Sequence, residues 1–214
     1  MYTHPAFRID KAAALALLRE RAFGIFIVPT EEAPFAVHVP FLVDLGDDGA
    51  LRVELHVARA NPIHAFIGGG CKALLVCQGP DAYLSPDWYG VTNQVPTWTY
   101  TAIHLKGTAR VLPEANNLRH VDRLSGFFEE RLLPKKPWSS SKIDEAKRSA
   151  MVKAIVSIAI DVESVDAQMK LIQHKGETEH RGAINGLRAR GCYGDQEVAS
   201  LMEQELLRRL ELDQ

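Results

Sequence analysis

The 214-residue sequence lacks any run of 18 or more apolar residues, and its first ten residues, MYTHPAFRID, contain neither the basic nor the apolar block of an export signal. We therefore expect a cytoplasmic protein with no membrane partner. The sequence also lacks a surplus of charge, because 25 Lys and Arg stand against 27 Asp and Glu. A net charge of −2 gives no general attraction to nucleic acid, so any anion-binding site must be local.

Cysteine is scarce as well. Cys71 and Cys77 lie six positions apart and Cys192 stands alone, which matches neither a zinc site nor a complete disulfide framework. We expect reduced thiols and no bound metal. The length and the 46% content of hydrophobic residues fit one globular domain with a sizeable core.

Short segments of alternating apolar and polar residues are abundant, and this alternation is typical of β-strands. Segments 35–45 and 51–58 flank the turn sequence GDDG and predict a hairpin, with Pro40 indicating an edge or a bulge. Four more strands are expected at 25–28, 72–79, 101–112 and 154–165. At least six strands at irregular spacing favour a closed or nearly closed antiparallel barrel, so the expected fold class is mainly β.

Helices are predicted around these strands. Asp10 can cap a helix that starts at residue 11 and ends at Gly24. Two more fall at 117–132 and 139–152, the second with a weak capping box of Ser141 and Asp144, and the tail predicts helices at about 178–190 and 195–211. We expect a single domain over 1–214, with a barrel core at about 1–168, a helical insertion at 114–153 and a C-terminal helical arm at 169–214.

The segment HVARANP, residues 56–62, ends the second strand of the hairpin in an unusual way. Asn61 followed by Pro62 predicts the capped start of a short helix. Helix starts attract phosphate groups, and Arg59 can add a charged contact to the same anion. The alternative is a plain cap beside a solvated arginine. The glycines at 68–70 follow this helix and match no phosphate-loop pattern.

His38 and His56 fall on the polar faces of the two hairpin strands, so they could face one ligand or simply face solvent. No carboxylate or third histidine stands at the spacing of a metal site. Residues 78–100 gather two of the three tryptophans and three of the five tyrosines. These rings are expected either to cover a planar ligand, to build a subunit interface or to fill a satellite core. Ser85 lacks a G-x-S-x-G setting, so we expect no catalytic serine.

The basic stretch 170–190 and the helix after it superficially match a helix-turn-helix DNA-binding motif. The second helix, however, carries Glu197, Glu203, Glu205 and Glu211. Acidic side chains on a recognition helix would repel phosphates, so the charge pattern does not support direct DNA binding.

Several motifs together closely resemble the PaiB-type family of FMN-binding negative transcriptional regulators: LHVARANP, LVCQGPDAYLSPDWY, VPTWTY with AIHLKG, IVSIAIDV and MKLIQHK. The resemblance covers nearly the whole chain. It implies a split β-barrel homodimer with FMN at the subunit interface and a role in gene repression. The sequence departs from the family pattern at SPDWY, PTWTY and KLIQH.

The resemblance also assigns site residues. The segment from His38 to Phe41, with Pro40, would line the flavin, and the phosphate would be surrounded by His56, Ala58, Arg59, Ala60 and Asn61, with the helix start at Pro62. Gln78 and Trp98 would approach the ring or the interface, and Lys170 and Gln173 would close the site. Two other functions stay open: an FMN-dependent reductase using the same pocket, or a haem-binding relative with His38, His56 or His174 as axial ligand.

Overall fold

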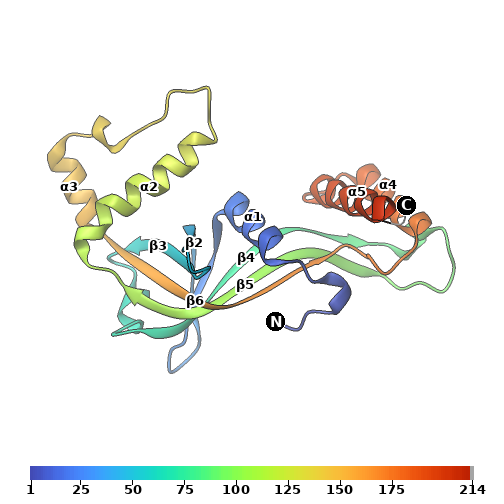
Figure 1. The fold of residues 1–214 in the computed structure, drawn as a ribbon, viewed down its shortest axis with the longest axis horizontal. Coiled ribbons are helices and arrows are strands. Elements are labelled where there is room, and N and C mark those ends of the chain that lie inside the picture. Colours follow the sequence, from blue (N-terminus) through green and yellow to red (C-terminus); the bar gives the residue numbers. More distant parts are fainter. Residues whose placement is uncertain (213–214) are drawn as a thin grey trace. The chain divides into compact units, whose positions relative to one another are not determined.

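A computed structural model describes residues 1–212. Six strands form the sheet: β1 (Phe23–Val28), β2 (Phe35–Leu45), β3 (Leu51–Ala58), β4 (Cys71–Leu84), β5 (Thr97–Val111) and β6 (Ile155–Lys170). They close into a barrel in the order β1-β2-β3-β6-β5-β4 (Figure 1). The predicted mainly β barrel is therefore confirmed, as is the hairpin of β2 and β3, whose ladder joins Phe41 to Leu55 and Leu45 to Leu51.

Residues 1–212 also form five α-helices: α1 (Lys11–Arg21), α2 (Asn117–Glu130), α3 (Glu145–Lys153), α4 (Glu177–Arg190) and α5 (Asp195–Leu212). Short 3-10 helices are η1 (Pro5–Phe7), η2 (Pro62–Phe66), η3 (Pro86–Tyr89), η4 (Glu114–Asn116) and η5 (Ser140–Lys142). Within residues 1–212, no helix is both long and apolar enough to cross a membrane.

The chain divides into two compact units. The barrel unit comprises Leu18–Cys77 and His104–Val165, and the helix-pair unit comprises Met1–Leu17, Gln78–Ile103 and the chain from Asp166 onward. Strands β4, β5 and β6 contribute residues to both. The expected core of about 1–168 differs from this division, because 1–17 and 78–103 group with the C-terminal region. The single domain stays a prediction.

The barrel interior is apolar. Phe26, Phe41, Leu55, Leu105 and Ile158 are fully buried, and they come from five different strands. Pro40 pairs with Phe23 at the end of the β1–β2 ladder, and the β2–β3 ladder begins at the next residue. A residue without an N–H group fits this change of partner, which explains the proline inside the strand pattern.

Three local predictions need correction. The first helix ends before Ala22, which has φ 45°, and Gly24 lies inside β1, where a Cβ atom would stand 2.5 Å from the Val76 carbonyl oxygen. Asp144, not Ser141, caps α3 by accepting a hydrogen bond from the Lys147 N–H at 2.9 Å. The strands predicted at 72–79 and 101–112 are longer than expected, because β4 continues through Pro80 to Leu84 and β5 begins at Thr97.

The helix-pair unit has its own core, in which α4 and α5 pack together over residues of β4 and η3 (Figure 1). Leu84, Tyr89, Ile184, Leu187 and Met202 are buried there. The two tail helices predicted at about 178–190 and 195–211 are confirmed as α4 and α5.

Candidate functional site

The segment 56–62 folds as its sequence predicts. Strand β3 ends at Ala58, and the Asn61 side chain accepts a hydrogen bond from the Ile63 N–H at 3.0 Å. Pro62 is the first residue of η2. The carbonyl oxygen of Arg59 lies 3.0 Å from His64 Nε2, which fixes the turn between the strand and the helix.

Arg59 is the cation of this segment, and its side chain is 47% exposed. Its Nε atom donates to the Lys153 carbonyl oxygen at 2.6 Å. Its Nη2 atom donates to Glu114 and to the Ile155 carbonyl oxygen, both at 3.0 Å. The Nη1 atom makes no hydrogen bond within the described chain. Arg59 therefore keeps the N–H groups of Nη1 for an anion, while Glu114 reduces its net charge.

The histidines of the hairpin face different surroundings. His38 is exposed and stacks on Phe23, with ring centroids 6.4 Å apart. His56 is half-buried, and its Nδ1 atom lies 3.0 Å from Nε2 of His120 on α2. Each histidine thus has a neighbour other than its counterpart on the next strand.

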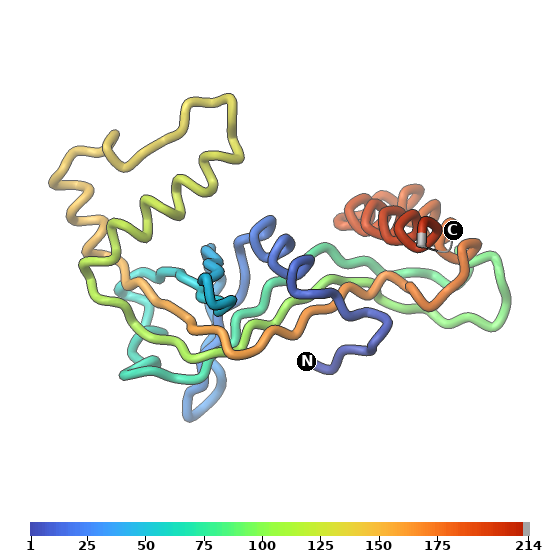
Figure 2. Tube along the Cα trace, viewed as in Figure 1, coloured from blue at the N-terminus to red at the C-terminus, as the bar shows by residue number. Residues whose placement is uncertain are grey.

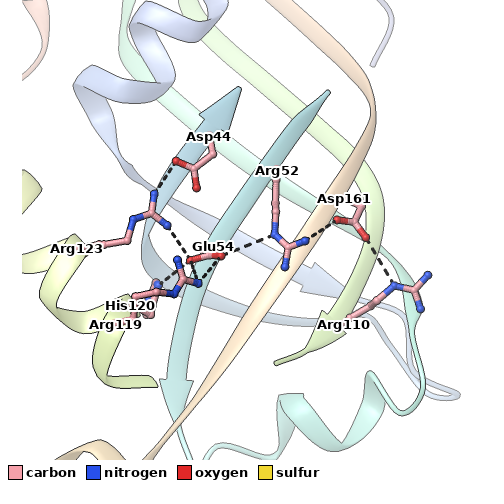
Figure 3. A network of polar contacts seen from close by, with 8 residues as sticks. All are labelled: Asp44, Arg52, Glu54, Arg110, Arg119, His120, Arg123 and Asp161. Carbon is pink, nitrogen blue, oxygen red and sulfur yellow. Dashed lines mark hydrogen bonds and ion pairs between the residues drawn. The ribbon is translucent and has the colours of Figure 1, made fainter. Parts of the chain in front are cut away.

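His56 and His120 belong to a polar network between β3 and α2 (Figure 3). Glu54 is only 4% exposed. Its carboxylate accepts hydrogen bonds from the guanidinium of Arg119 at 3.0 Å and from that of Arg123 at 3.1 Å. Arg123 also reaches Asp44 at 2.6 Å. Figure 3 shows the same network continuing through Arg52 to Asp161 and Arg110.

Burial controls the protonation of the two histidines. Desolvation lowers the pKa of His56, and desolvation, with the neighbouring His56, lowers the pKa of His120 to about 4. Both rings are therefore neutral near pH 7. The alternation of residues in β3 does not show by itself that the polar face of this strand is covered. The sequence feature that could have indicated a cover is the spacing of Arg119 and Arg123, which lie one helical turn apart on a predicted helix.

Cavities of the barrel unit contain or adjoin different parts of the predicted site. Phe41, with Arg123, lines one of about 440 Å³. His56 lines a second of about 270 Å³, between α2 and α3. Glu114 and Lys153, which hold Arg59, line a third of about 270 Å³. Phe41 and His56 therefore line different cavities. Ala58, Arg59, Ala60 and Pro62 are exposed, and Pro40 is half-buried.

The remaining predicted residues lie in the helix-pair unit. Gln78 donates to Asp81 at 2.9 Å, and Gln173 bonds locally to the Leu171 N–H and the Met169 carbonyl. Lys170 donates to Thr97 at 2.8 Å and lies 5.9 Å from the Tyr100 ring centroid.

The aromatic residues of 78–100 divide into two groups. Trp88 and Tyr89 pack in or against the core of the helix-pair unit, as the satellite-core alternative expected. Trp98 is 55% exposed and meets the 38% exposed Tyr83 edge-on, with centroids 6.1 Å apart. This pair leaves a flat aromatic surface uncovered.

The donors present fit a mononucleotide flavin. In the barrel unit, the free Nη1 atom of Arg59 suits a phosphate. In the helix-pair unit, taken by itself, the exposed rings of Trp98 and Tyr83 suit contact with another aromatic ring. No group of three His, Cys, Asp or Glu that could hold a metal occurs among the described residues.

Four of the five arginines of the described tail helices are paired with carboxylates, and Arg209 donates to the Lys175 carbonyl oxygen at 3.3 Å. Arg188 meets Glu203 at 2.7 Å, Arg181 meets Glu177 at 2.6 Å and Arg208 meets Glu205 at 2.9 Å. Arg190 bonds to the buried Asp195. Guanidinium groups held by carboxylates add little attraction to DNA phosphates.

Comparison with known proteins agrees with this fit. The chain is 28% identical over 211 residues to "Protease synthase and sporulation protein PAI 2" of Bacillus subtilis, covering 98% of this chain and 100% of that protein. Its fold is similar to that of an FAD and heme binding protein from Mycobacterium smegmatis, with 14% identity, a TM-score of 0.53 and coverage of 76% and 72% of the two chains. A flavocytochrome from Azotobacter vinelandii matches with 14% identity, a TM-score of 0.50 and coverage of 76% and 68%. Residues 1–164 match the family described as "Putative FMN-binding domain", and the chain belongs to this family of FMN-binding proteins.

Proposed function

We propose that the protein is a homodimeric, FMN-binding regulator of the PaiB type that influences transcription without direct DNA contact by its tail helices. The observation that carries the proposal is Arg59, a half-exposed guanidinium at the end of β3 whose Nη1 atom has free donors. The family match to an FMN-binding domain supplies the ligand.

The exposed position of the predicted residues supports a site shared between two copies of the chain. Arg59 lies on the surface of the barrel unit, and Trp98 lies on the surface of the helix-pair unit. A flavin needs both a phosphate contact and cover for its ring. A second copy could supply surfaces that one chain leaves open, and the apolar side chains of Trp98 and Tyr83 suit burial in such an interface.

Flavin titration tests the phosphate contact. FMN and riboflavin differ only in the phosphate, so Arg59→Ala should weaken FMN binding at least tenfold and leave riboflavin binding unchanged. Arg110→Ala is the matched control, because Arg110 is also an exposed, carboxylate-paired arginine of the barrel unit. Equal FMN affinity of Arg59→Ala and the native protein would contradict the assignment.

Two further measurements separate the alternatives. Indirect regulation predicts no salt-sensitive shift of promoter DNA by the purified protein, and a sequence-selective shift would contradict it. Bleaching of the flavin absorbance by NAD(P)H, with recovery in air, would instead favour the reductase. Sedimentation should show a dimer that Trp98→Ala weakens, whereas Tyr193→Ala, at a fully exposed ring, should have no effect.

A further inference from the structure

The helical insertion of the barrel unit encloses a cavity that the flavin does not explain. After α2 the chain runs back along the helix before α3 begins (Figure 2). The cavity of about 270 Å³ lies between these segments and β6. Its wall is mostly apolar and includes Leu118, Val121, Leu124, Ile143, Met151 and Val152.

The size and the lining indicate the kind of ligand. An apolar cavity of about 150 Å³ holds one benzene molecule, so this cavity has room for a substituted single ring or a small fused pair. The half-buried indole of Trp138 forms part of the wall and can stack against such a ring.

His56 is one of five polar or charged residues at this wall, with Asp122, Ser125, Ser140 and Arg148, and its neighbours determine which of its ring nitrogens carries the proton. His120 Nδ1 is buried without a hydrogen-bond partner, and its nearest acidic atom is Glu54 Oε2 at 3.8 Å. A neutral imidazole places its proton toward a carboxylate, which leaves His120 Nε2 as an acceptor.

The position of the proton on His120 determines the position of the proton on His56. His56 Nδ1 lies 3.0 Å from His120 Nε2, so it must be the donor. A neutral His56 therefore has an unprotonated Nε2 atom, which bonds to no described residue. The order Glu54, His120, His56 presents a hydrogen-bond acceptor at the cavity wall.

The surrounding charges favour a neutral ligand. Asp122 is exposed at the cavity, and the charge of Arg148 is offset by Glu145. A carboxylate ligand would find no free cation here and no proton to accept from His56. We propose that this cavity binds a small neutral aromatic molecule whose single hydroxyl or ring N–H donates a hydrogen bond to His56 Nε2.

Calorimetry on the full-length protein tests the proposal with indole and 1-methylindole. The two probes differ in one N–H donor, so indole should bind roughly tenfold more tightly, because 1-methylindole leaves the acceptor unpaired. His56→Phe should remove this difference. If the native protein binds both probes equally, or binds neither at millimolar concentration, the proposal is wrong.

A second variant locates the binding. Val152→Trp should fill the cavity and abolish indole binding, whereas Leu207→Trp, at an exposed position of α5, should leave it unchanged. Retained indole binding by Val152→Trp would place the site elsewhere. Nitrogen NMR of the native protein should show His56 Nε2 as unprotonated at neutral pH, and a protonated Nε2 would contradict the proton order. The proposal gives His56 a role in this cavity in place of the phosphate contact that the family resemblance implies.

Discussion

Two pairs of helices pack against strands of this protein, and they differ in what fills the space between the helices and the strands. Helices α4 and α5 fill the space between themselves and the strands with a continuous apolar core. Helices α2 and α3 leave a cavity of about 270 Å³ and carry a buried polar network instead. The filled pair is packed with buried apolar side chains, whereas the hollow pair has both room for a ligand and a polar group to orient one.

The glycines of the two helix pairs show this difference in packing most directly. Gly182 and Gly186 let α4 approach Trp88 so closely that a Cβ atom at Gly182 would stand 1.9 Å from the Trp88 carbonyl oxygen. Gly126 of α2 has no atom within 4 Å of the same position. A glycine in a helix is thus required in one pair and dispensable in the other.

The largest effect should come from Gly182→Ala. The added methyl group meets backbone that cannot rotate away, so we expect a loss of about 4 kcal/mol in the free energy of unfolding, above the usual cost of overpacking. Urea unfolding followed by circular dichroism measures it. A loss below about 1 kcal/mol would show that α4 can shift away from Trp88, and the contrast between the two pairs would then be weaker.

The polar network of the hollow pair should make stability depend on pH. The unfolded chain takes up a proton at His120 near pH 6.5, but the folded protein does so only at about pH 4. Stability should therefore fall as the pH drops through this window, by up to about 3 kcal/mol from His120 alone. Burial lowers the pKa of His56, His174 and His180 as well, so the native slope contains their contributions.

A variant isolates the part that belongs to His120. Between pH 6.5 and 4, the free energy of unfolding should depend less steeply on pH in His120→Gln than in the native protein. The difference in slope should correspond to about one proton fewer taken up on unfolding. An unchanged slope would mean that the position titrates alike in the folded and unfolded chain.

Asp195 is the buried carboxylate of the filled pair. It accepts hydrogen bonds from the Cys192 N–H at 2.8 Å and from Arg190, and its pKa is lowered chiefly by the Arg190 guanidinium. Asp195→Asn keeps the shape and removes the charge. Because Arg190 is partly exposed, we expect a loss of about 2 kcal/mol, less than for a fully buried ion pair.

The matched measurement is Ser200→Ala on the same helix, where the hydroxyl bonds only to the Gln196 carbonyl and the expected change is within about 0.5 kcal/mol. Equal effects of the two substitutions would indicate that the charge of Asp195 contributes nothing to joining α4 and α5.

The features that could be predicted from the sequence are those fixed by near neighbours. The hairpin follows from alternation around GDDG, and the cap at Asn61 bonds only two residues away. The tail helices follow from their own pattern and the GCYG turn. In each case the interactions that decide the structure lie within one element or one turn.

The features that could not be predicted depend on distant partners. Glu54 looks like a solvated side chain in the strand pattern, but Arg119 and Arg123, 65 and 69 residues later, cover it. The donors of Arg59 reach Lys153 and Ile155 in the same way. A pattern of residue types cannot show which helix covers a polar strand face, and the role of each predicted flavin residue stays a prediction for the same reason.

The smallest expected change in the free energy of unfolding is a gain, whereas the larger changes above are losses. Gly126→Ala places a methyl group in open space on α2, facing the cavity of about 440 Å³ that Phe41 also lines. Alanine restricts the unfolded chain more than glycine does and favours the helix, so unfolding should cost about 0.5 to 1 kcal/mol more. Opposite signs for Gly126→Ala and Gly182→Ala, measured by the same urea titration, would show that α2 packs loosely where α4 packs tightly. A loss at Gly126 would mean that the structure around this position closes in solution, and the cavity of about 440 Å³ would be smaller than the structure shows.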